Sequence, residues 1–376
     1  MKILLLNWKD IRNPAAGGAE IVAFQIAQRL VQQGHSVTFF ARTFPQAPST
    51  ENSQGIRVIR QGGLFSVYVC AWWHYHRLAV KPDLVIDMVN TLPWFTPWYV
   101  PRQQRLLYVN QLAAEVFFYH LPPLLSWLAY LSERLLYLSY QTTSVVCISK
   151  STKKDLCSIG LPAENIHVYP LGIDHQQYSP SEEKEAFPLF VFVGRLVKMK
   201  RAETCIEAMR IVADRYPHAK LVILGQGPEK QSLQSSIHKL RLDQNVSLLS
   251  NNDSIGNEED KVHFLQKSWA LLLPSVKEGW GMVVIEAAAS GTPSIVSNVS
   301  GLKDSVINRK TGLVGSPLPT PQELAHLMLE IIEQPSLRED LSRGALAWSK
   351  KFSWEKSYQR IKEIIDAQVT SAPTPM

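Results

Sequence analysis

Two glutamates, Glu278 and Glu286, stand eight residues apart in the second half of the chain. We expect Glu278 to lie in a loop broken by glycines at 279 and 281, and Glu286 to lie in the helix that this loop opens. A helix N-terminus offers unpaired backbone N–H groups and a positive dipole end to an anion. One carboxylate would then lie at the anion, and the other would accept hydrogen bonds from hydroxyl groups. A phosphate joined to a polyol, as in a nucleotide-sugar, satisfies both better than a solvated helix with two surface acids.

A second group of residues follows the apolar run 190–193 and combines a glycine with two cations. Gly194 permits close approach of the backbone, Arg195 offers a bidentate fork, and Lys200, five residues on, adds a point charge. This arrangement suits a diphosphate and would neutralise the charge that develops as the diphosphate leaves. Basic residues before a helix oppose its dipole, so a bound anion explains them better than a plain basic loop.

Two further glycine-containing turns are candidates for ligand contact. Gly17 and Gly18 precede the first expected helix, where an anion or a sugar can rest against backbone amides. The turn 225–228 follows another strand and either borders the same site or is a simple turn. Neither turn has the G-x-G-x-x-G or Gly-Lys-Ser/Thr pattern, and the second strand lacks the terminal acid that holds an NAD ribose. The sequence therefore disfavours a dinucleotide-dependent dehydrogenase and a P-loop enzyme.

Composition indicates a large folded protein. The chain has 376 residues, 45% of them hydrophobic and 19% charged, which predicts two domains. No apolar run reaches the roughly 18 residues of a membrane span, and the apolar start of the chain reads as a first strand. Four scattered cysteines without ligand spacing predict reduced thiols in a cytoplasmic protein and no structural zinc: Cys70, Cys147, Cys157 and Cys205.

The positive charge is uneven along the chain. Residues 1–180 hold 15 Lys and Arg against 10 Asp and Glu, which gives +5 of the total +6. Such an excess points to an anionic partner such as a membrane surface, a lipid phosphate or nucleic acid, or else to an evenly basic surface.

Apolar runs of strand length alternate with helical patterns throughout, which predicts an α/β protein with parallel sheets. We expect two doubly wound Rossmann-like domains that face a central cleft, over residues 1–180 and 181–352, with a helix at 353–369 and a disordered tail at 370–376. The expected strands are Ile3–Leu6, Ser36–Ala41, Ile56–Arg60, Leu84–Asp87, Arg105–Val109, Ser144–Ile148, Leu189–Val193, Lys220–Leu224, Val246–Leu249, Ala270–Leu273 and Ser294–Ser297.

Aromatic residues interleaved with arginines cluster between residues 64 and 140. Rings beside basic residues favour the membrane interface, and residues 121–140 are predicted to form an amphipathic helix pair on a bilayer. The competing interpretation is that most of these rings build the core. The same residues could stack bases, but no nucleic-acid motif accompanies them, so nucleic acid is not an expected partner.

These residues resemble the retaining glycosyltransferases with two Rossmann-like domains, the GT-B type of family four (glycosyl transferases group 1). The resemblance covers nearly the whole chain and rests most on Gly194-Arg195 with Lys200, and on Glu278 with Glu286. Supporting segments are 17–20, 147–150, 169–174, 290–293 and 311–313, and the helix near Trp354 is similar to one that crosses back to the first domain.

The resemblance implies roles for these residues. Arg195 and Lys200 would hold the donor diphosphate without a metal ion or a cofactor, Glu278 would contact the sugar hydroxyls, and Glu286 the ribose hydroxyls. Gly17 and Gly18 would close the cleft from the acceptor side. Backbone amides would contact the sugar and the distal phosphate at Gly279, Trp280, Gly281, Met282 and Val283, beside Gly194.

One position departs from the family pattern. Many relatives carry a sugar-contacting histidine just after the strand that corresponds to residues 105–109, where this chain has Asn110. His120, ten residues on, is the alternative candidate for that contact, or else a plain loop residue.

The expected reaction transfers a hexose from a nucleoside-diphosphate sugar to an acceptor hydroxyl with retention of configuration. Because no carboxylate is placed for a covalent intermediate, we expect front-face attack with the leaving diphosphate accepting the proton. The basic, aromatic first half favours a lipid-linked or saccharide acceptor, in lipid-linked or cell-surface polysaccharide synthesis at the inner face of a membrane. The alternatives are a sugar-nucleotide epimerase and a non-catalytic sugar-nucleotide-binding protein.

Overall fold

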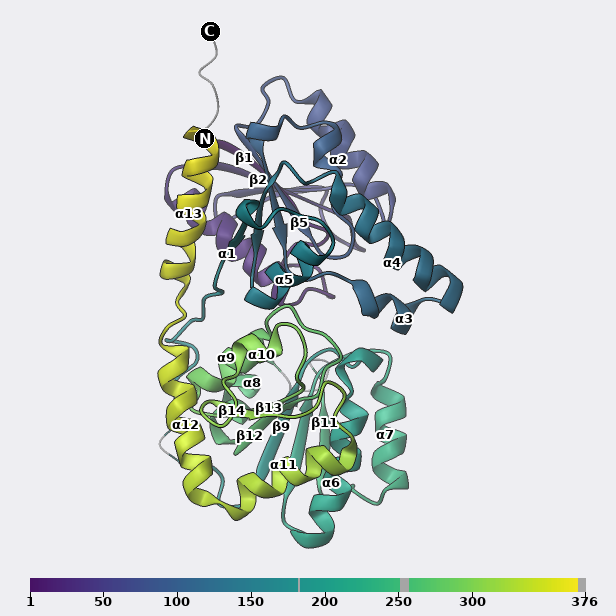
Figure 1. The fold of residues 1–376 in the computed structure, drawn as a ribbon, viewed down its shortest axis with the longest axis vertical. Helices are drawn as coiled ribbons and strands as arrows, with labels where there is room; N and C mark the ends of the chain where they lie inside the picture. The colour runs from purple at the N-terminus through teal and green to yellow at the C-terminus, as the bar shows by residue number, and fades with distance from the viewer. Residues whose placement is uncertain (182, 251–256, 371–376) are drawn as a thin grey trace. The chain divides into compact units, whose positions relative to one another are not determined.

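The structure is a computed structural model that describes residues 1–181, 183–250 and 257–370 (Figure 1). The chain divides into two compact units, one of Met1–Leu171 together with the segment from Trp354 onward, and one of Gly172–Ser353. The sequence places the boundary after residue 180, whereas residues 172–180 belong to the second unit. The tail expected at 370–376 lies outside the described residues except for Thr370, which ends the last helix.

The first unit is built on an eight-stranded sheet in the order β3-β4-β2-β1-β5-β6-β7-β8, in which only the β3–β4 pair is antiparallel. Its strands are β1 Lys2–Leu6, β2 Ser36–Ala41, β3 Thr50–Ser53, β4 Ile56–Arg60, β5 Leu84–Val89, β6 Arg105–Val109, β7 Ser144–Cys147 and β8 Ile166–Val168. Its helices are α1 Gly18–Gln32, α2 Ser66–Arg77, α3 Phe117–His120, α4 Pro123–Leu138, α5 Lys150–Ser158 and α13 Trp354–Thr370.

The second unit has a six-stranded, fully parallel sheet in the order β11-β10-β9-β12-β13-β14. Its strands are β9 Leu189–Val193, β10 Lys220–Leu224, β11 Val246–Leu249, β12 Ala270–Leu273, β13 Ser294–Val296 and β14 Gly312–Val314. Its helices are α6 Ala202–Arg215, α7 Lys230–Lys239, α8 Glu258–Lys267, α9 Met282–Ala289, α10 Leu302–Ser305, α11 Pro321–Glu333 and α12 Pro335–Ser349. The predicted α/β class with two doubly wound parallel sheets is therefore confirmed.

Each sheet has a point at which the strand order reverses. In the second unit the chain passes from β9 outward through β10 and β11, then returns to place β12 on the other side of β9. In the first unit β1 is followed by β2 and β4 on one side and by β5 on the other. Ligands of open α/β sheets bind beyond the carboxyl ends of the strands at such a point. The residues after β9 and β12, and after β1 and β5, are therefore the ones to inspect.

All the strands expected from the sequence are present, and three further strands were missed: β3, β8 and β14. β3 is a polar edge strand, Thr-Glu-Asn-Ser, whose half-exposed side chains carry no apolar alternation. β8 and β14 have three residues each, too few for a period to be recognised.

The aromatic segment divides between core and surface. Trp94, Tyr108 and Tyr137 are fully buried, so the core interpretation holds for them, whereas Trp73 and Trp127 are exposed. The expected amphipathic helix pair at 121–140 is wrong, because a single helix, α4, spans this stretch after the short α3. Among the described residues, no helix combines the length and apolarity needed to cross a bilayer.

The C-terminal helix α13 packs on the first unit beside α1 (Figure 1). The Ser357 hydroxyl donates to the Pro170 carbonyl at 2.5 Å, and the Arg29 guanidinium lies 5.6 Å from the centre of the Trp354 ring. Near the other end, the Gln368 amide donates to the Arg102 carbonyl at 3.0 Å. These contacts fix α13 at both ends, so it is an integral part of this unit.

A buried carboxylate, Asp87 within β5, joins three segments of the first unit. It accepts hydrogen bonds from the hydroxyls of Tyr140 at 2.6 Å and Thr96 at 2.7 Å, and from the Trp94 N–H at 3.1 Å. Burial raises the pKa of Asp87, and the hydrogen bonds from Tyr140 and Thr96 oppose that rise. A nearby hydroxyl, that of Tyr137, is equally buried but has no partner among the described residues.

This contrast gives a matched pair of variants. Tyr140→Phe removes a donor from Asp87 and should lower the free energy of unfolding by about 1.5 kcal/mol more than Tyr137→Phe, because a buried carboxylate loses a hydrogen bond. Urea denaturation of both variants measures the difference. Equal destabilisation by the two variants would show that the Tyr140–Asp87 bond contributes little to stability.

Candidate functional site

The loop after β9 begins at Gly194 and ends in the short 3₁₀ turn Lys198–Lys200. The Gly194 N–H donates to the Leu224 carbonyl, and the Leu196 N–H donates to the Gln226 carbonyl at 2.8 Å. Leu196 is fully buried and anchors the loop. Arg195 is exposed beside it, and its guanidinium has no partner among the residues that the structure describes. Arg195 is therefore free to reach an anion from a fixed backbone.

Two glycines after β10 allow this loop to lie directly against its neighbour. A Cβ atom at Gly225 would come within 1.9 Å of the Gly194 carbonyl oxygen, and one at Gly227 within 2.2 Å of the Leu196 oxygen. Both distances are far below any real contact, so the two loops can pack only with glycine at these positions. The turn at 225–228, which the sequence left open between a site border and a simple turn, lies against the Gly194 loop.

Lys200 and Glu278 meet at the switch point of the second unit. The Lys200 ammonium forms an ion pair with the Glu278 carboxylate, and the Ser275 hydroxyl donates to the same carboxylate at 3.0 Å. The Val276 N–H also donates to the Met199 carbonyl at 2.9 Å, which ties the loop after β12 to the loop after β9. The side chains of Lys200 and Glu278 are 15% and 13% exposed, so both remain reachable from solvent. The sequence predicted these two residues at one site, and the structure brings them into contact.

The segment from Gly279 to Val283 leads from Glu278 into α9. Gly281 has a φ of 77°, and a Cβ at Gly301 would approach the Glu278 carbonyl oxygen to 2.3 Å. Gly301 therefore fixes this loop, a role that sequence reasoning missed. α9 begins at Met282, so the first N–H groups of the helix face the end at which Glu278 lies.

Trp280 does not point outward as a ligand-binding side chain. It is buried against Phe352, with ring centres 5.5 Å apart, and its indole N–H has no partner among the described residues. Only its backbone amide remains as a candidate ligand contact.

Glu286 is buried on α9 and has its own cation. The Lys261 ammonium on α8 lies 3.1 Å from Glu286 and 2.7 Å from Glu258, and the Tyr178 hydroxyl donates to Glu258. Burial raises the pKa of Glu286. Burial opposes the charge on Lys261, but the two carboxylates outweigh it and raise the pKa of Lys261. Lys261 was not expected from the sequence, since nothing in its spacing links it to Glu286.

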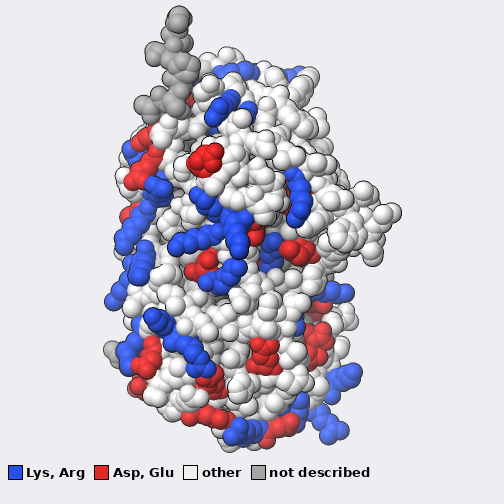
Figure 2. All heavy atoms as spheres, viewed as in Figure 1, with Lys and Arg blue, Asp and Glu red and all other residues white. Residues whose placement is uncertain are grey.

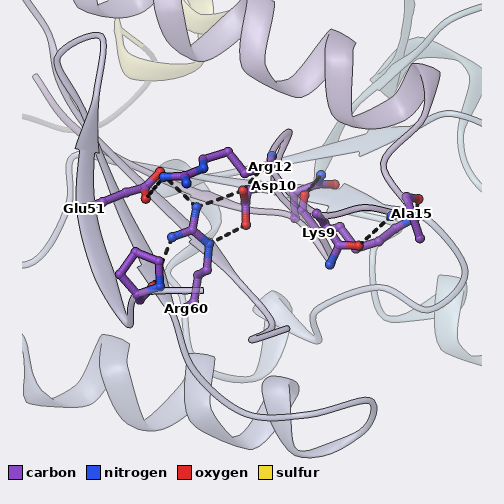
Figure 3. A network of polar contacts seen from close by, with 9 residues as sticks. Lys9, Asp10, Arg12, Ala15, Glu51 and Arg60 are labelled. Carbon is purple, nitrogen blue, oxygen red and sulfur yellow. Dashed lines mark hydrogen bonds and ion pairs between the residues drawn. The ribbon is translucent and has the colours of Figure 1, made fainter. Parts of the chain in front are cut away.

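In the first unit, the loop after β1 is held by two clusters of charges (Figure 3). Arg60 is fully buried and donates to Asp10 at 2.7 and 2.9 Å and to Glu51 at 3.0 Å, while Arg12 pairs with Glu51 at 2.5 Å. The hydrogen bonds to Asp10 outweigh burial and raise the pKa of Arg60. Lys9 donates to the Ala15 carbonyl at 2.5 Å in the second cluster. The loop is therefore rigid before any ligand arrives.

Glu20, which lies in the segment 17–20, contacts the loop after β1 from the first turn of α1. Its carboxylate accepts from the Gly17 N–H at 2.7 Å and from the Asn90 amide at 3.3 Å, and it lies 3.7 Å from the Lys9 ammonium. Asn90 follows β5, so this contact spans the switch point of the first sheet. A Cβ atom at Gly17 would meet only the Glu20 carboxylate, at 3.8 Å, and its φ of −150° suits any residue. The fold itself therefore does not require glycine at position 17.

Asn110 and His120 are the two candidates for a contact with the donor sugar in the first unit. Asn110 follows β6. Its side-chain amide donates to the Val89 carbonyl at 3.5 Å, and its backbone carbonyl accepts from the Thr152 hydroxyl. His120 ends α3, and its side chain lies outside the described part of the structure. A sugar contact by either residue stays a prediction.

Within residues 1–181, 183–250 and 257–370, no three side chains of His, Cys, Asp or Glu gather closely enough to hold a metal ion. The four cysteines are free thiols.

Two family models match consecutive parts of the chain. The model described as Glycosyltransferase Family 4 matches residues 16–177, and the model described as Glycosyl transferases group 1 matches residues 174–348. The second match contains Arg195, Lys200, Glu278 and Glu286, and the first contains Gly17 and Gly18.

Known proteins support the same relationship. An uncharacterized glycosyltransferase of Methanocaldococcus jannaschii is 26% identical over 94% of this chain and 95% of its own length. The capsular polysaccharide biosynthesis glycosyltransferase CapM of Staphylococcus aureus is 28% identical over 60% of this chain and 63% of its own.

Solved structures share the fold over the whole chain. Sucrose-phosphate synthase of Thermosynechococcus elongatus has a TM-score of 0.81 at 21% identity, covering 99% of this chain and 100% of its own. HepE of Anabaena, solved in complex with UDP-glucose, has a TM-score of 0.77 at 18% identity, covering 98% and 100%. With two parallel-sheet units and both family models matched in order, the chain belongs to the group 1 and family 4 glycosyltransferases and has the GT-B fold.

Proposed function

We propose that this glycosyltransferase moves a hexose from a nucleoside-diphosphate sugar to an acceptor hydroxyl with retention of the anomeric configuration. The observation that carries the proposal is the meeting of Lys200 and Glu278 at the switch point of the second sheet, beside the rigid Gly194 loop. A cation that would bind the diphosphate, Lys200, thus lies next to a carboxylate, Glu278, that would accept hydrogen bonds from sugar hydroxyls. The UDP-glucose complex of the structurally similar HepE is consistent with such a donor.

In the proposed reaction the C1–O bond to the distal phosphate breaks, and the acceptor oxygen bonds to C1 on the same face. The acceptor proton passes to the leaving phosphate oxygen, so atoms and charges balance without a protein base. Arg195 and Lys200 would stabilise the charge on the departing diphosphate, and the N–H groups at the start of α9 would bind the distal phosphate. Catalysis by positioning and electrostatics requires a preformed site, which the glycine-packed loops after β9, β10 and β12 supply.

Glu278 has two states in this proposal. Without donor its carboxylate binds Lys200, and with donor Lys200 would bind the diphosphate while Glu278 accepts from the sugar hydroxyls. Glu286 would accept from the ribose hydroxyls while Lys261 keeps its buried carboxylate charged. Each acid therefore has one cation that stabilises it when no substrate is bound.

For the acceptor, we propose a lipid-linked or surface saccharide reached at a membrane. The support lies in α4, whose polarity is inverted: Glu133 and Ser126 are buried, while leucines face outward. The Glu133 carboxylate accepts from the N–H groups of Ala113 and Ala114, at 2.7 and 2.8 Å. The exposed apolar residues follow helical spacing at Leu121, Leu124, Leu128, Leu131, Leu135 and Leu138.

This leucine face has the character of a membrane-contact surface. In Figure 2 the outer part of the projection formed by α3 and α4 shows no Lys, Arg, Asp or Glu on the visible side. Trp127 and Tyr119 are exposed near it and suit the boundary between headgroups and acyl chains. A helix face of this kind binds a bilayer by burying apolar area without crossing it.

The first prediction concerns the donor site. Glu278→Gln and Lys200→Met should each lower kcat about 100-fold or more, because each removes a group that binds the donor or its leaving diphosphate. The measurement is a transfer assay with labelled nucleotide-sugars and the acceptor fraction of cell extract, with thermal unfolding followed in parallel.

The matched controls are Glu207→Gln and Lys239→Met, which remove exposed charges elsewhere in the second unit. Full activity of a folded Glu278→Gln variant would remove the site assignment. The same assay tests the reaction class: the product should keep the donor's anomeric configuration by NMR and form in the presence of EDTA. Free sugar products without acceptor would indicate an epimerase, and donor binding without turnover a binding protein.

The second prediction concerns Gly17. Since a methyl group fits there without strain, Gly17→Ala should leave the melting temperature unchanged while it raises the donor KM about tenfold, if the backbone approaches a ligand at that point. Gly301→Ala is the contrasting variant, because its methyl group would collide with the Glu278 loop and destabilise the unit. An unchanged donor KM in Gly17→Ala would place Gly17 outside the donor site.

The third prediction concerns the membrane. Leu131→Gln should weaken binding to vesicles of anionic phospholipid about tenfold, because one leucine less is buried in the bilayer. Leu318→Gln is the control, as the two leucines are 53% and 52% exposed. Co-sedimentation at low salt measures both. No binding by the unsubstituted protein would reject membrane contact, as would a dimer in solution that Leu131→Gln abolishes, since the leucine face would then pair with a second copy.

A further inference from the structure

A pocket separate from the Lys200–Glu278 site lies in the second unit. It lies at the amino ends of the strands, opposite the end at which Glu278 lies. Trp269 directly precedes β12 and Pro293 directly precedes β13, so the pocket lies where these strands begin. Its volume is 320 Å³, within the range of about 300–1,000 Å³ typical of small-molecule sites. The lining residues are Lys184, Trp269, Gly291, Pro293, Arg338, Glu339, Ser342 and Arg343. None of these residues has a role in the proposed transfer reaction.

Lys184 is largely buried there without a counter-charge. Its ammonium donates to the Gln266 carbonyl at 2.7 Å, to the Thr292 hydroxyl at 2.5 Å and to the Ser290 carbonyl at 3.4 Å. All three acceptors are neutral, and no carboxylate of the described residues pairs with it. Lys184 therefore brings a positive charge to the pocket that nothing in the structure balances.

Arg338 is the second unbalanced cation. Its guanidinium lies over Trp269, with the central carbon 3.6 Å from the ring centre, and its Nη1 atom is buried without a partner among the described residues. The Trp269 indole N–H donates to the Glu185 carbonyl at 2.8 Å, which fixes the ring. A buried donor without an acceptor is unfavourable, so a ligand that supplies the acceptor is favoured at this point.

The remaining charges of the pocket do not compensate these two. Arg343 pairs with Asp340 and lies 3.9 Å from Glu339, and all three side chains are exposed. Lys267 also acts on Lys184, and its charge adds to the positive potential. The pocket is thus positive at its buried end and balanced only at its rim.

We propose that this pocket binds a small tetrahedral oxyanion, the chemical class of a phosphate group, between Lys184 and Arg338. Arg338 would donate hydrogen bonds after a small rotation of its guanidinium toward the cavity, and Lys184 would supply charge, since its own N–H groups are already engaged. The site is separate from the donor site because it lies at the opposite ends of the same strands. It does not rest on the proposed transfer reaction.

The protonation of Lys184 gives the site a pH signature. Burial, with Lys267 and Arg338 nearby, lowers the pKa of Lys184 to about 7. A bound anion favours the charged ammonium, so affinity is greatest below pH 7 and falls as the pH rises through that value. The other charged groups that line the pocket are Arg338, Arg343 and Glu339.

The test is calorimetric titration with inorganic sulfate at pH 6 and pH 8, at constant ionic strength set with chloride. Sulfate keeps its charge over this range, so any change in affinity comes from the protein. We expect binding at pH 6 that weakens at least fivefold at pH 8. Lys184→Met and Arg338→Gln should each weaken binding at pH 6 at least tenfold, with folding checked by circular dichroism.

Two further variants locate the ion. Lys239→Met removes an exposed lysine elsewhere and should leave sulfate affinity unchanged. Lys200→Met at the donor site should leave the part of the sulfate binding that Lys184→Met and Arg338→Gln remove. Absence of binding to the unsubstituted protein at pH 6 would overturn the proposal. It would equally fail if Lys200→Met abolished binding while Arg338→Gln kept it, because the ion would then occupy the donor site.

Discussion

The candidate donor site depends on the close approach of backbone loops that only glycine permits. The loops after β9 and β10 lie so near each other that a methyl group at Gly225 would overlap the Gly194 carbonyl oxygen. The loops after β12 and β13 meet in the same way, where Gly301 lies against the Glu278 backbone. Four loops at the carboxyl ends of adjacent strands are thereby locked together, which leaves the charged side chains as the movable parts. Such a frame suits electrostatic catalysis, where donors must be in place before the charge develops.

Within this set of packed loops, the charged side chains form ion pairs. Glu278 holds Lys200, and Glu286 holds Lys261, so neither acid is left buried without a cation. Removing one member of a buried pair leaves an uncompensated charge, which costs more than the pair itself contributes. A ligand that binds Lys200 must therefore offer Glu278 new hydrogen-bond donors. A diphosphate linked to a sugar does both at once, whereas free diphosphate offers only the anion. In the proposed reaction, the pairing would therefore favour the intact donor over its leaving group.

Much of this arrangement was predictable, because buried parallel strands are short apolar runs and the glycine-bearing loops follow them directly. β9 with Gly194 and Lys200, and the loop with Glu278, were found on that basis and meet in the structure. What escaped prediction depends on contacts distant in sequence, such as Lys261 with Glu286 or Arg60 with Asp10. Residues 121–140 were predicted to lie on a bilayer, but as a helix pair rather than as the single helix α4. The run of leucines does not tell which side of this helix faces outward, and Glu133, bonded to two backbone N–H groups, shows which side is inside.

The helix α9 runs from the carboxyl ends of the strands of the second sheet to their amino ends. α9 starts next to the Glu278 loop and ends at Ala289. The carbonyl of the next residue, Ser290, accepts from Lys184, and the Gly291 carbonyl accepts from the Ser342 hydroxyl of α12. The eight residues of α9 span about 12 Å, and Ala287 and Ala289 on it are fully buried. A close-packed interior transmits strain, so a displacement at one end of so short a helix reaches the other end. Any effect of an ion at Lys184 on the donor loop would therefore act through α9, which also carries Glu286, the partner of Lys261.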